Sequence, residues 1–525
     1  MDISGMTSLG DIARTGAHRH PAALALRFEG RDTSFAALDE ASNRVAHGLA
    51  ALGLKPGDRI ALLSRNIDRF FEVLIGAAKA GVVVVPIGWR LAPDEIGYLL
   101  RDSGARLLFT VPEFGDIAAA LRADTPHLDR LFTLEGEHHV LDDYVRWRDA
   151  QPGHDPALPV DPGSAVLQLY TSGTTGRPKG AVLSHANIVT VRQATVAAGL
   201  PWSQWSADDV SLLAMPVTHI AGIGWAFIAL MNGARTLLLR DFAADAVLDH
   251  IARDGVSKMF LVPSALQALV ALPRARTIDY GRLRYILYGA SPIPLALLKQ
   301  CVAVFGCGFV QMYGMTETAG TAAYLPPEDH DPDGNPRMAA AGLPLPGVEI
   351  RIVDEAGAPL PPNVVGEVAI RSPGVMIGYW RREEESGAAI DADGWMRSGD
   401  AGYIDADGYL FLHDRIKDMI VSGGENVYPA EVENALYAHP AVAEVAVIGV
   451  PDARWGEAVK AVVVPHPGAT IDAGEVIAFA RERLAGYKTP KSVDFIDALP
   501  RNAAGKVLRR ALREPYWAGR SRRVN

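Results

Sequence analysis

The segment YTSGTTGRPKG, residues 170–180, carries the strongest signal in this sequence. Positions 171–180 hold three glycines, four hydroxyl residues and one lysine, which give a loop with exposed backbone N–H groups and hydroxyl donors. The strand-like run AVLQLY (165–170) leads into the loop, and Ser184 shortly after it is placed to cap a helix. A loop of this composition can wrap a polyanion.

The loop differs from the Walker A phosphate loop. That motif needs its second glycine where Pro178 stands, and it needs Ser or Thr where Gly180 follows Lys179. Pro178 fixes the approach of the chain to Lys179, which makes an ordinary surface turn a poor interpretation. We therefore expect an anion-binding loop of another kind.

Composition narrows the class of protein. The 525 residues are enough for three or four structural units, and 49% hydrophobic with 21% charged residues excludes disorder for most of the chain. A net charge of −10 argues against a general DNA or RNA binder, so no nucleic-acid partner is expected. Cys301 and Cys307 lie six positions apart, which suits neither a disulfide framework nor a zinc site and favours the reducing cytoplasm.

One apolar stretch is long enough that a transmembrane helix has to be considered. Residues 212–231 are about long enough to span a bilayer. Pro216, Thr218, His219 and two glycines interrupt the stretch, so we expect a buried strand followed by a helix and no transmembrane segment. The amino-terminal residues also lack the pattern of a secretory signal. Peripheral contact with a membrane stays open, as does a homo-oligomer.

Short apolar runs alternate with helix-length segments along the chain, the pattern of layered α/β folds with largely parallel sheets. The Pro-, Asp- and Gly-rich residues 326–346 read as a loop between two parts of the core. After Asp414 the pattern restarts and predicts about 110 residues of a separate small domain. Its expected elements are a helix at 429–437, strands at 442–450 and 458–464, a helix at 473–484 and a strand at 493–496.

Six segments in a fixed order resemble one superfamily. They are YTSGTTGRPKG (170–180), YGASP (288–292), QMYGMTET (311–318), GWMRSGD (394–400), DRIKDMIVSGGENVYPAEVE (414–433) and PRNAAGKVLRR (500–510). Together they resemble the AMP-forming adenylating enzymes, which include acyl-CoA synthetases, peptide-synthetase adenylation domains and firefly-type luciferases. The resemblance implies an α/β fold with a large amino-terminal domain of several subdomains and layered sheets, residues 1–415. A small mobile α+β domain, residues 416–525, is expected to follow it.

The resemblance also implies a reaction in two steps. A carboxylate attacks the α-phosphate of ATP to give acyl-AMP and pyrophosphate, and a thiol, here that of coenzyme A, then attacks the activated carbonyl. The implied ligands are therefore ATP, Mg²⁺, coenzyme A and a small carboxylic acid. The expected ATP-binding residues are Thr171, Ser172, Gly173, Thr174, Thr175, Gly176 and Lys179 around the β- and γ-phosphates, Gly289, Ala290, Ser291, Tyr313 and Gly314 at the adenine, Thr318 at the α-phosphate, and Asp400 and Arg415 at the ribose.

Further roles follow from the same resemblance. Glu317 is expected to bind Mg²⁺, because a hard cation prefers carboxylate oxygen. Lys506 is expected to reach the reacting carboxylate and α-phosphate, carried there by a rotation about Lys417. After the rotation, Gly423 and Gly424 would line the tunnel for the pantetheine arm of coenzyme A. An ion pair of Arg415 with Asp414 or Asp418 is the alternative for that arginine.

The acid is the least determined part of the interpretation. His219 is expected near the carboxylate as a gate or general base, with a packed core histidine as the alternative. Expected walls of the acyl pocket are Trp225, Tyr288 and Met312. The segments SGGENVYPAEVE and PRNAAGK resemble bacterial fatty-acyl-CoA and aryl-CoA ligases more than peptide-synthetase domains. Between these two we expect a fatty acid over an aryl acid of the hydroxycinnamate or benzoate type. An enzyme that donates its adenylate to a carrier protein is less favoured, and nineteen residues after Lys506 are too few for a carrier domain of its own.

Overall fold

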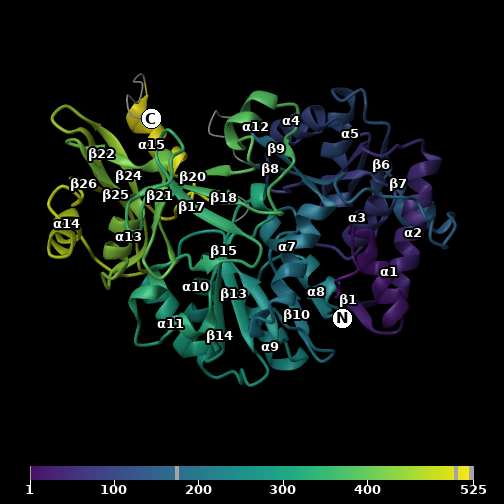
Figure 1. Cartoon of the computed structure of the whole chain (residues 1–525), viewed down its shortest axis with the longest axis horizontal. Helices are drawn as coiled ribbons and strands as arrows, with labels where there is room; N and C mark the ends of the chain where they lie inside the picture. The colour runs from purple at the N-terminus through teal and green to yellow at the C-terminus, as the bar shows by residue number, and fades with distance from the viewer. Residues whose placement is uncertain (1, 172–176, 502–506, 519–525) are drawn as a thin grey trace.

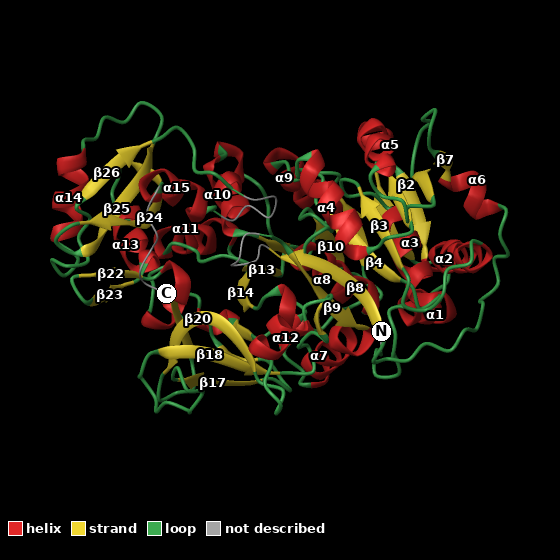
Figure 2. Cartoon of the chain, turned by 90° about the horizontal axis from the view of Figure 1, so that it is seen from above, coloured by secondary structure: helices red, strands yellow, loops and turns green. Residues whose placement is uncertain are grey.

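The computed structural model describes residues 2–171, 177–501 and 507–518. In these residues most strands join four sheets, which we call A to D. Helices alternate with the strands as the sequence predicts, and the result is a layered α/β fold. Figures 1 and 2 place the elements from β22 onward at one end of the molecule and α1–α3 toward the other.

The α-helices are short to medium in length, and several start at the residues that sequence reasoning favours. Ser184, for example, accepts a hydrogen bond from Asn187 N–H (3.0 Å) and caps α7. The helices are α1 (Gly10–Arg19), α2 (Phe35–Ala51), α3 (Arg69–Lys79), α4 (Pro93–Ser103), α5 (Gly115–Ala123), α6 (Tyr144–Asp149), α7 (His185–Ala197), α8 (Ile220–Met231), α9 (Ala244–Asp254), α10 (Pro263–Ala271), α11 (Leu295–Phe305), α12 (Glu383–Ala389), α13 (Pro429–Tyr437), α14 (Ala473–Arg481) and α15 (Arg509–Trp517).

Sheet B contains both ends of the anion-binding loop. Strands β8 and β9 form an antiparallel pair in which Thr171 is opposite Lys179. The other strands from β4 to β7 run parallel to their neighbours. In spatial order the sheet is β19 (Gly378–Tyr379), β9 (Lys179–Ser184), β8 (Ala165–Thr171), β4 (Val83–Ile87), β3 (Arg59–Leu63), β5 (Leu107–Thr110), β6 (Arg130–Thr133) and β7 (Asp142–Asp143).

Sheet A has a parallel centre with antiparallel strands at both edges. From β14 to β1 every neighbouring pair is parallel. The order is β16 (Leu343–Pro344), β15 (Ala323–Leu325), β14 (Gly308–Tyr313), β13 (Tyr285–Gly289), β12 (Lys258–Leu261), β10 (Val210–Leu213), β11 (Arg235–Leu238), β1 (Leu24–Phe28) and β2 (Arg31–Ser34). Gly289 and Tyr313 therefore end neighbouring parallel strands at the same edge, where α/β folds place their ligands.

Sheets C and D belong to the second half of the chain. Sheet C is antiparallel, with β17 (Glu349–Val353), β18 (Gly366–Arg371), β20 (Met396–Ile404) and β21 (Leu410–Arg415). Sheet D contains β23 (Glu425–Val427), β22 (Ile420–Ser422), β25 (Gly456–Pro465) and β24 (Val442–Asp452), with β26 (Ser492–Phe495) parallel to β25. The short helix η7 (Ile416–Asp418) connects the two sheets.

The expected elements of the carboxyl-terminal part are present with small differences at their ends. The helix predicted at 473–484 ends at Arg481, since the next residues form a turn in which Leu484 N–H still bonds the Ala480 carbonyl. The buried apolar clusters that contain residues 420–499 share no member with the large cluster of residues 3–410. This division lies next to the boundary predicted at residues 415 and 416, which stays a prediction.

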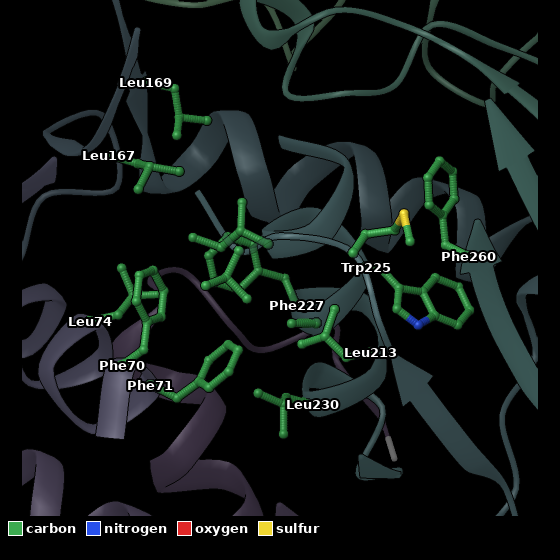
Figure 3. Close-up of a cluster of buried hydrophobic side chains, with 14 of the residues drawn as sticks. Phe70, Phe71, Leu74, Leu167, Leu169, Leu213, Trp225, Phe227, Leu230 and Phe260 are labelled. Atoms are coloured by element: carbon green, nitrogen blue, oxygen red, sulfur yellow. The ribbon is translucent and has the colours of Figure 1, made fainter. Parts of the chain in front are cut away.

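The apolar stretch at 212–231 is the strand and helix that the sequence predicts. It forms the end of β10 and all of α8, and no helix in the described ranges has both the length and the apolar character to cross a bilayer. Helix α8 is apolar on most of its faces because it lies in the core, where Leu167 and Leu169 of sheet B, Phe70 of α3 and Leu213 of sheet A surround it (Figure 3).

Candidate active site

Close backbone packing limits which residues fit at the edge of sheet A, where the adenine-binding residues are expected. A Cβ atom on Gly289 would lie 2.1 Å from the Met312 carbonyl oxygen, so only glycine fits between β13 and β14 at this point. Ala290 next to it has a φ of +68°, which turns the chain out of the strand. The structure thus brings Gly289, Ala290 and Ser291 to the strand end beside Tyr313.

Asp400 is held by two side chains from different elements. The Tyr313 hydroxyl donates to its Oδ2 (2.6 Å), and Arg415 Nε lies 2.7 Å from its Oδ1. Asp400 on β20 is directly opposite Arg415 on β21, and only 9% of Asp400 is exposed. Arg415 therefore pairs with Asp400, and the alternative partners Asp414 and Asp418 bond other residues.

The Asp400 carboxylate changes the pKa of both of its partners, Arg415 and Tyr313. Burial is the largest single effect on Arg415 and lowers its pKa, but the Asp400 carboxylate, with smaller contributions from Tyr313, Glu317 and Asp418, more than offsets burial, so the pKa of the guanidinium is raised. Burial and the same carboxylate raise the pKa of the Tyr313 hydroxyl well above its usual value. Tyr313 and Arg415 therefore hold the Asp400 carboxylate in place as donors. Its remaining lone pairs can accept hydrogen bonds from a ribose.

Glu317 forms a second buried carboxylate site beside the anion-binding loop. Its Oε1 accepts hydrogen bonds from the Tyr379 hydroxyl (2.9 Å) and from Thr171 Oγ1 (3.3 Å). Thr171 is the last residue of β8, and Tyr379 belongs to β19, which pairs with β9. Lys179 Nζ lies 5.4 Å from the centre of the Tyr379 ring and 3.7 Å from Glu385 Oε1. One end of the loop therefore contacts this carboxylate, and the other end lies next to the tyrosine that bonds it.

The surroundings of Glu317 suit a magnesium ion better than a metal that several protein side chains coordinate. In the described residues no three His, Cys, Asp or Glu side chains converge on a common point. Glu317, at 6% exposure, would supply one hard oxygen ligand, and Mg²⁺ commonly takes one or two carboxylates and completes its shell with phosphate and water oxygens. Ser172, Gly173, Thr174, Thr175 and Gly176, predicted to bind phosphates, lie outside the described residues.

Thr318 does not have the environment expected of a phosphate ligand. Its side chain is fully buried, its Oγ1 both donates to the Met315 carbonyl and accepts from Met315 N–H, and its own N–H bonds the same carbonyl. The residue closes the turn η4 (Thr316–Thr318) and so fixes the position of Glu317. Gly314 is required nearby, since a Cβ there would lie 2.5 Å from the Gly320 backbone.

His219 lies at the amino-terminal end of α8. Burial, with a smaller effect of the positive Arg90, lowers the pKa of its imidazole to about 4, so the ring is neutral at pH 7. Its Nε2 is buried and has no hydrogen-bond partner among the described residues. A neutral ring with one unused nitrogen is compatible with the expected gate and with the weaker expectation of a general base.

Two of the three expected pocket walls line one cavity. Trp225 and Met312 border a small cavity of about 30 Å³ between α7, α8 and the strands β13 and β14. Tyr288 lies outside this cavity, because alternation along β13 directs Leu287 into it and Tyr288 to the opposite face. There the Tyr288 hydroxyl bonds Gln311 (3.1 Å) and His330 (3.0 Å). Figure 3 shows Trp225 beside Phe260, on the far side of the cluster from Phe70.

The carboxyl-terminal part approaches the same edge of sheet A. Arg501 and Val507 pair as an isolated bridge and line a cavity together with Ser291 and Pro292. Lys506 lies between them, outside the described residues. The hinge candidate Lys417 is exposed in η7, and Gly423 and Gly424, with φ of +64° and +87°, form the turn between β22 and β23.

Tyr379 is the member of the site that sequence reasoning misses. It lies 62 positions after Glu317, and it reaches Glu317 because the two-residue strand β19 extends sheet B next to β9. The segment 378–380 reads Gly-Tyr-Trp, and a short aromatic run after a glycine has no unique structural meaning. Only the pairing of strands far apart in sequence identifies this tyrosine.

Comparisons with known proteins agree with this geometry. A family model described as "AMP-binding enzyme" matches residues 13–380, and one described as "AMP-binding enzyme C-terminal domain" matches residues 431–506. A fatty acid–[acyl-carrier-protein] ligase of Streptomyces coeruleorubidus is 43% identical over 97% of this chain and 96% of its own length. A feruloyl-CoA synthase of an Amycolatopsis species is 41% identical over 97% and 99%.

A solved structure gives the same result for the fold. ATP-bound MatB from Rhodopseudomonas palustris superposes with a TM-score of 0.88 at 33% identity, covering 97% of this chain and 99% of MatB. The chain therefore belongs to the AMP-binding enzyme family within the adenylate-forming superfamily. It is an ATP-dependent adenylating enzyme of the acyl- or aryl-CoA ligase group, and the predicted α/β fold with layered sheets and a smaller carboxyl-terminal domain is confirmed.

Replacing Asp400 tests its role at the ribose. Asp400→Asn keeps the size of the side chain but exchanges charged acceptors for a neutral one, and charge-assisted hydrogen bonds are about twice as strong as neutral ones. For two such bonds we expect a loss of about 2 to 3 kcal/mol, or about 30-fold to 140-fold in kcat/KM for ATP. The control is Asp407→Asn at an exposed residue paired with Arg337. An unchanged KM for ATP in a folded Asp400→Asn protein would contradict the assignment.

Removing the Tyr379 hydroxyl tests the magnesium site. Tyr379→Phe leaves Glu317 without the donor that orients it, and such partners typically affect metal affinity or activity by an order of magnitude or more. We expect the Mg²⁺ concentration for half-maximal pyrophosphate release to rise about tenfold. Tyr403→Phe, where the ring stacks on Phe411 in sheet C, is the matched control. Identical Mg²⁺ titrations for the two variants would argue against this site.

Proposed function

We propose that this protein is an ATP-dependent carboxylic acid–CoA ligase that acts on a fatty acid. In the first step one carboxylate oxygen bonds to the α-phosphorus of ATP and pyrophosphate leaves, which gives acyl-AMP. In the second step the sulfur of coenzyme A bonds to the acyl carbon, AMP leaves, and the thiol proton is released. The observation that carries the proposal is the convergence of two buried carboxylates, Asp400 and Glu317, on one edge of the sheets.

Each part of the site has a chemical task in this reaction. A carboxylate is a poor electrophile at neutral pH, and its mixed anhydride with AMP supplies a good leaving group. Asp400 would hold the ribose hydroxyls while the close-packed strand end at Gly289 accepts the adenine. Lys179 and Thr171 would meet the phosphates at the loop ends. Mg²⁺ bound at Glu317 would offset the negative charge of the phosphates.

The acid needs a cation at its reacting oxygen, and Lys506 is our candidate. The residues on both sides of the undescribed segment, Arg501 and Val507, already line a cavity with Ser291, which supports delivery of the lysine to the nucleotide side. A lysine in that place would block the thiol, so the same domain must withdraw before the second step. The connection at η7, with Lys417 exposed in it, is where we place the rotation.

The cavity beside Trp225 and Met312 is our candidate for the acyl group. Its lining is mostly apolar, which supports a fatty acid. Three tryptophans, Trp202, Trp205 and Trp225, line the same cavity, and this aromatic wall favours an aryl acid as the second candidate. The relatives include ligases for both kinds of acid and one that loads a carrier protein, so the thiol acceptor also needs a direct test.

The reaction can be tested with ATP, Mg²⁺, coenzyme A and a panel of fatty and aromatic acids. We expect AMP and pyrophosphate in equal amounts, with turnover that depends on coenzyme A. Release of ADP or orthophosphate in place of AMP would overturn the proposal. Pyrophosphate release that ignores coenzyme A would point to the adenylate-only alternative with a carrier-protein acceptor.

Lys506→Ala separates the two half-reactions. Loss of a cation that acts on the transition state should lower acyl-AMP formation by about a hundredfold or more. Thioester formation from supplied acyl-AMP should remain within a few-fold of the unmodified protein. Lys491→Ala removes an exposed lysine of the same domain and serves as the control. Equal loss in both half-reactions would refute the assigned role of Lys506.

Lys417→Pro tests the rotation. Proline fixes φ near −65° and restricts the residue before it, so it should limit the backbone change that η7 must make. We expect adenylation to stay measurable while the second step slows by at least about tenfold. Lys417→Ala, which removes the side chain but leaves the backbone free, should retain the overall turnover. A proline variant with normal turnover would contradict the hinge.

A further inference from the structure

Helix α4 bonds the anion-binding loop near both of its ends. The Tyr98 hydroxyl donates to the Pro178 carbonyl (3.0 Å), and Asp102 accepts a hydrogen bond from the Tyr170 hydroxyl (2.7 Å). Positions four apart lie on one face of a helix, so α4 directs both side chains toward the same neighbours, and Figure 1 shows it beside β8 and β9. Tyr170 and Pro178 are the sequence neighbours of the residue pair with which the β8–β9 ladder ends.

These two bonds fix the direction of the chain on each side of the loop. Tyr170 and Thr171 are consecutive in β8, so their side chains point to opposite faces of the sheet: Tyr170 toward α4, and Thr171 toward Glu317 at 3.3 Å. On the other side, the ring of Pro178 fixes φ, and the bond from α4 holds the carbonyl of the peptide group that leads into Lys179. The positions of Thr171 and Lys179 therefore depend on α4.

The carboxyl-terminal end of α4 is also tied to the strand that orients Glu317. The Trp380 indole N–H donates to the Asp102 carbonyl (3.0 Å), which belongs to the last turn of α4, where carbonyls have no partner within the helix. The backbone N–H of Trp380 bonds the Gly180 carbonyl (2.8 Å), and the preceding residue, Tyr379, bonds Glu317. One helix end thus holds the loop ends and the partner of Glu317 together.

The bond between Tyr170 and Asp102 persists at neutral pH. Burial, and after it the Asp102 carboxylate, raise the pKa of the Tyr170 hydroxyl well above its usual value, so the hydroxyl stays protonated and donates. Asp102 has a second partner, since Arg382 Nη2 lies 3.4 Å from its Oδ1, and its side chain is only 13% exposed. Two partners from different elements restrict the carboxylate to one orientation.

We propose that Tyr98 and Asp102 are positioning residues for the β- and γ-phosphates of ATP. They act through Thr171 and Lys179, whose backbone they fix, and the inference rests on the proposed function, in which these two residues meet the phosphates. Without one of the bonds from α4, Thr171 or Lys179 can take more positions, and ATP binding must then also restrict them. Pyrophosphate contains the same two phosphates, whereas acyl-AMP contains neither.

Tyr98→Phe tests the bond to Pro178, because it removes the hydroxyl and keeps the ring. We expect the KM for ATP to rise about fivefold, and the KM for pyrophosphate in ATP formation from acyl-AMP to rise by the same factor, with little change in kcat. Thioester formation from supplied acyl-AMP should not change. Tyr280→Phe is the matched control, since the Tyr280 hydroxyl also donates to a backbone carbonyl, that of Ala275 (2.7 Å).

Asp102→Asn tests the bond at the other end of the loop. Asparagine keeps the size of the side chain but replaces the carboxylate by a weaker, neutral acceptor, so we expect the KM for ATP and for pyrophosphate to rise about tenfold. Asp329→Asn is the matched control. Asp329, in η5 (Pro327–Asp329), also accepts a tyrosine hydroxyl, that of Tyr409 (2.7 Å), and also pairs with an arginine, Arg337 (3.5 Å).

The two half-reactions separate positioning from general stability. Unchanged KM values for ATP and pyrophosphate in folded Tyr98→Phe and Asp102→Asn proteins overturn the inference and leave the proposed function intact. An equal loss in both half-reactions, accompanied by a lower Tm, assigns the two residues to the stability of the fold and overturns it as well. Failure of the unmodified protein to form AMP from any acid counts against the proposed function, and the inference falls with it.

Discussion

The Asp400 carboxylate is where separate parts of the chain are joined. Tyr313 reaches it from the end of β14 in sheet A, and Arg415 reaches it from β21 in sheet C. Because little of the group is exposed, its charge is stabilised by these two partners in place of water. The contact joins sheet C to the edge of sheet A, together with the backbone bridge between Gly342 and Leu410. It also places the ends of β14 and β21 side by side, next to the connection that follows β21.

Asp414, the residue before Arg415, connects β21 to the carboxyl-terminal part of the chain. Asp414 Oδ1 lies 3.4 Å from Arg509 Nη1 of α15, and Arg509 also pairs with Glu433 of α13 (2.8 Å). Burial raises the pKa of Asp414 to about 6, against the effect of Arg509. Successive residues of a strand point to opposite faces, so β21 ends with one side chain bound to each part of the molecule. The pivot candidate in η7 starts directly after this pair.

The features that sequence predicted well depend on local chemistry. The cap at Ser184, the strand and helix across residues 212–231 and the elements of sheet D follow from capping, apolar length and turn residues. Tyr288 does not line the cavity that Trp225 and Met312 border, and its neighbour Leu287 does. The sequence could not distinguish the two, because both are bulky and largely apolar and only the alternation along β13 decides which of them faces α8. Thr318 lies in the right segment, but its hydroxyl is used by the turn itself.

The pairing of Asp414 with Arg509 joins positions 95 residues apart, one at each side of the connection between the two parts of the chain. A carboxyl-terminal segment taken from a relative and fused at residue 416 would bring its own residue at the position of Arg509 but keep Asp414 of the recipient. The choice of fusion point therefore matters when carboxyl-terminal segments are exchanged between members of this family. The junction belongs before residue 400, so that the Asp400–Arg415 pair and the Asp414–Arg509 pair each come from one parent.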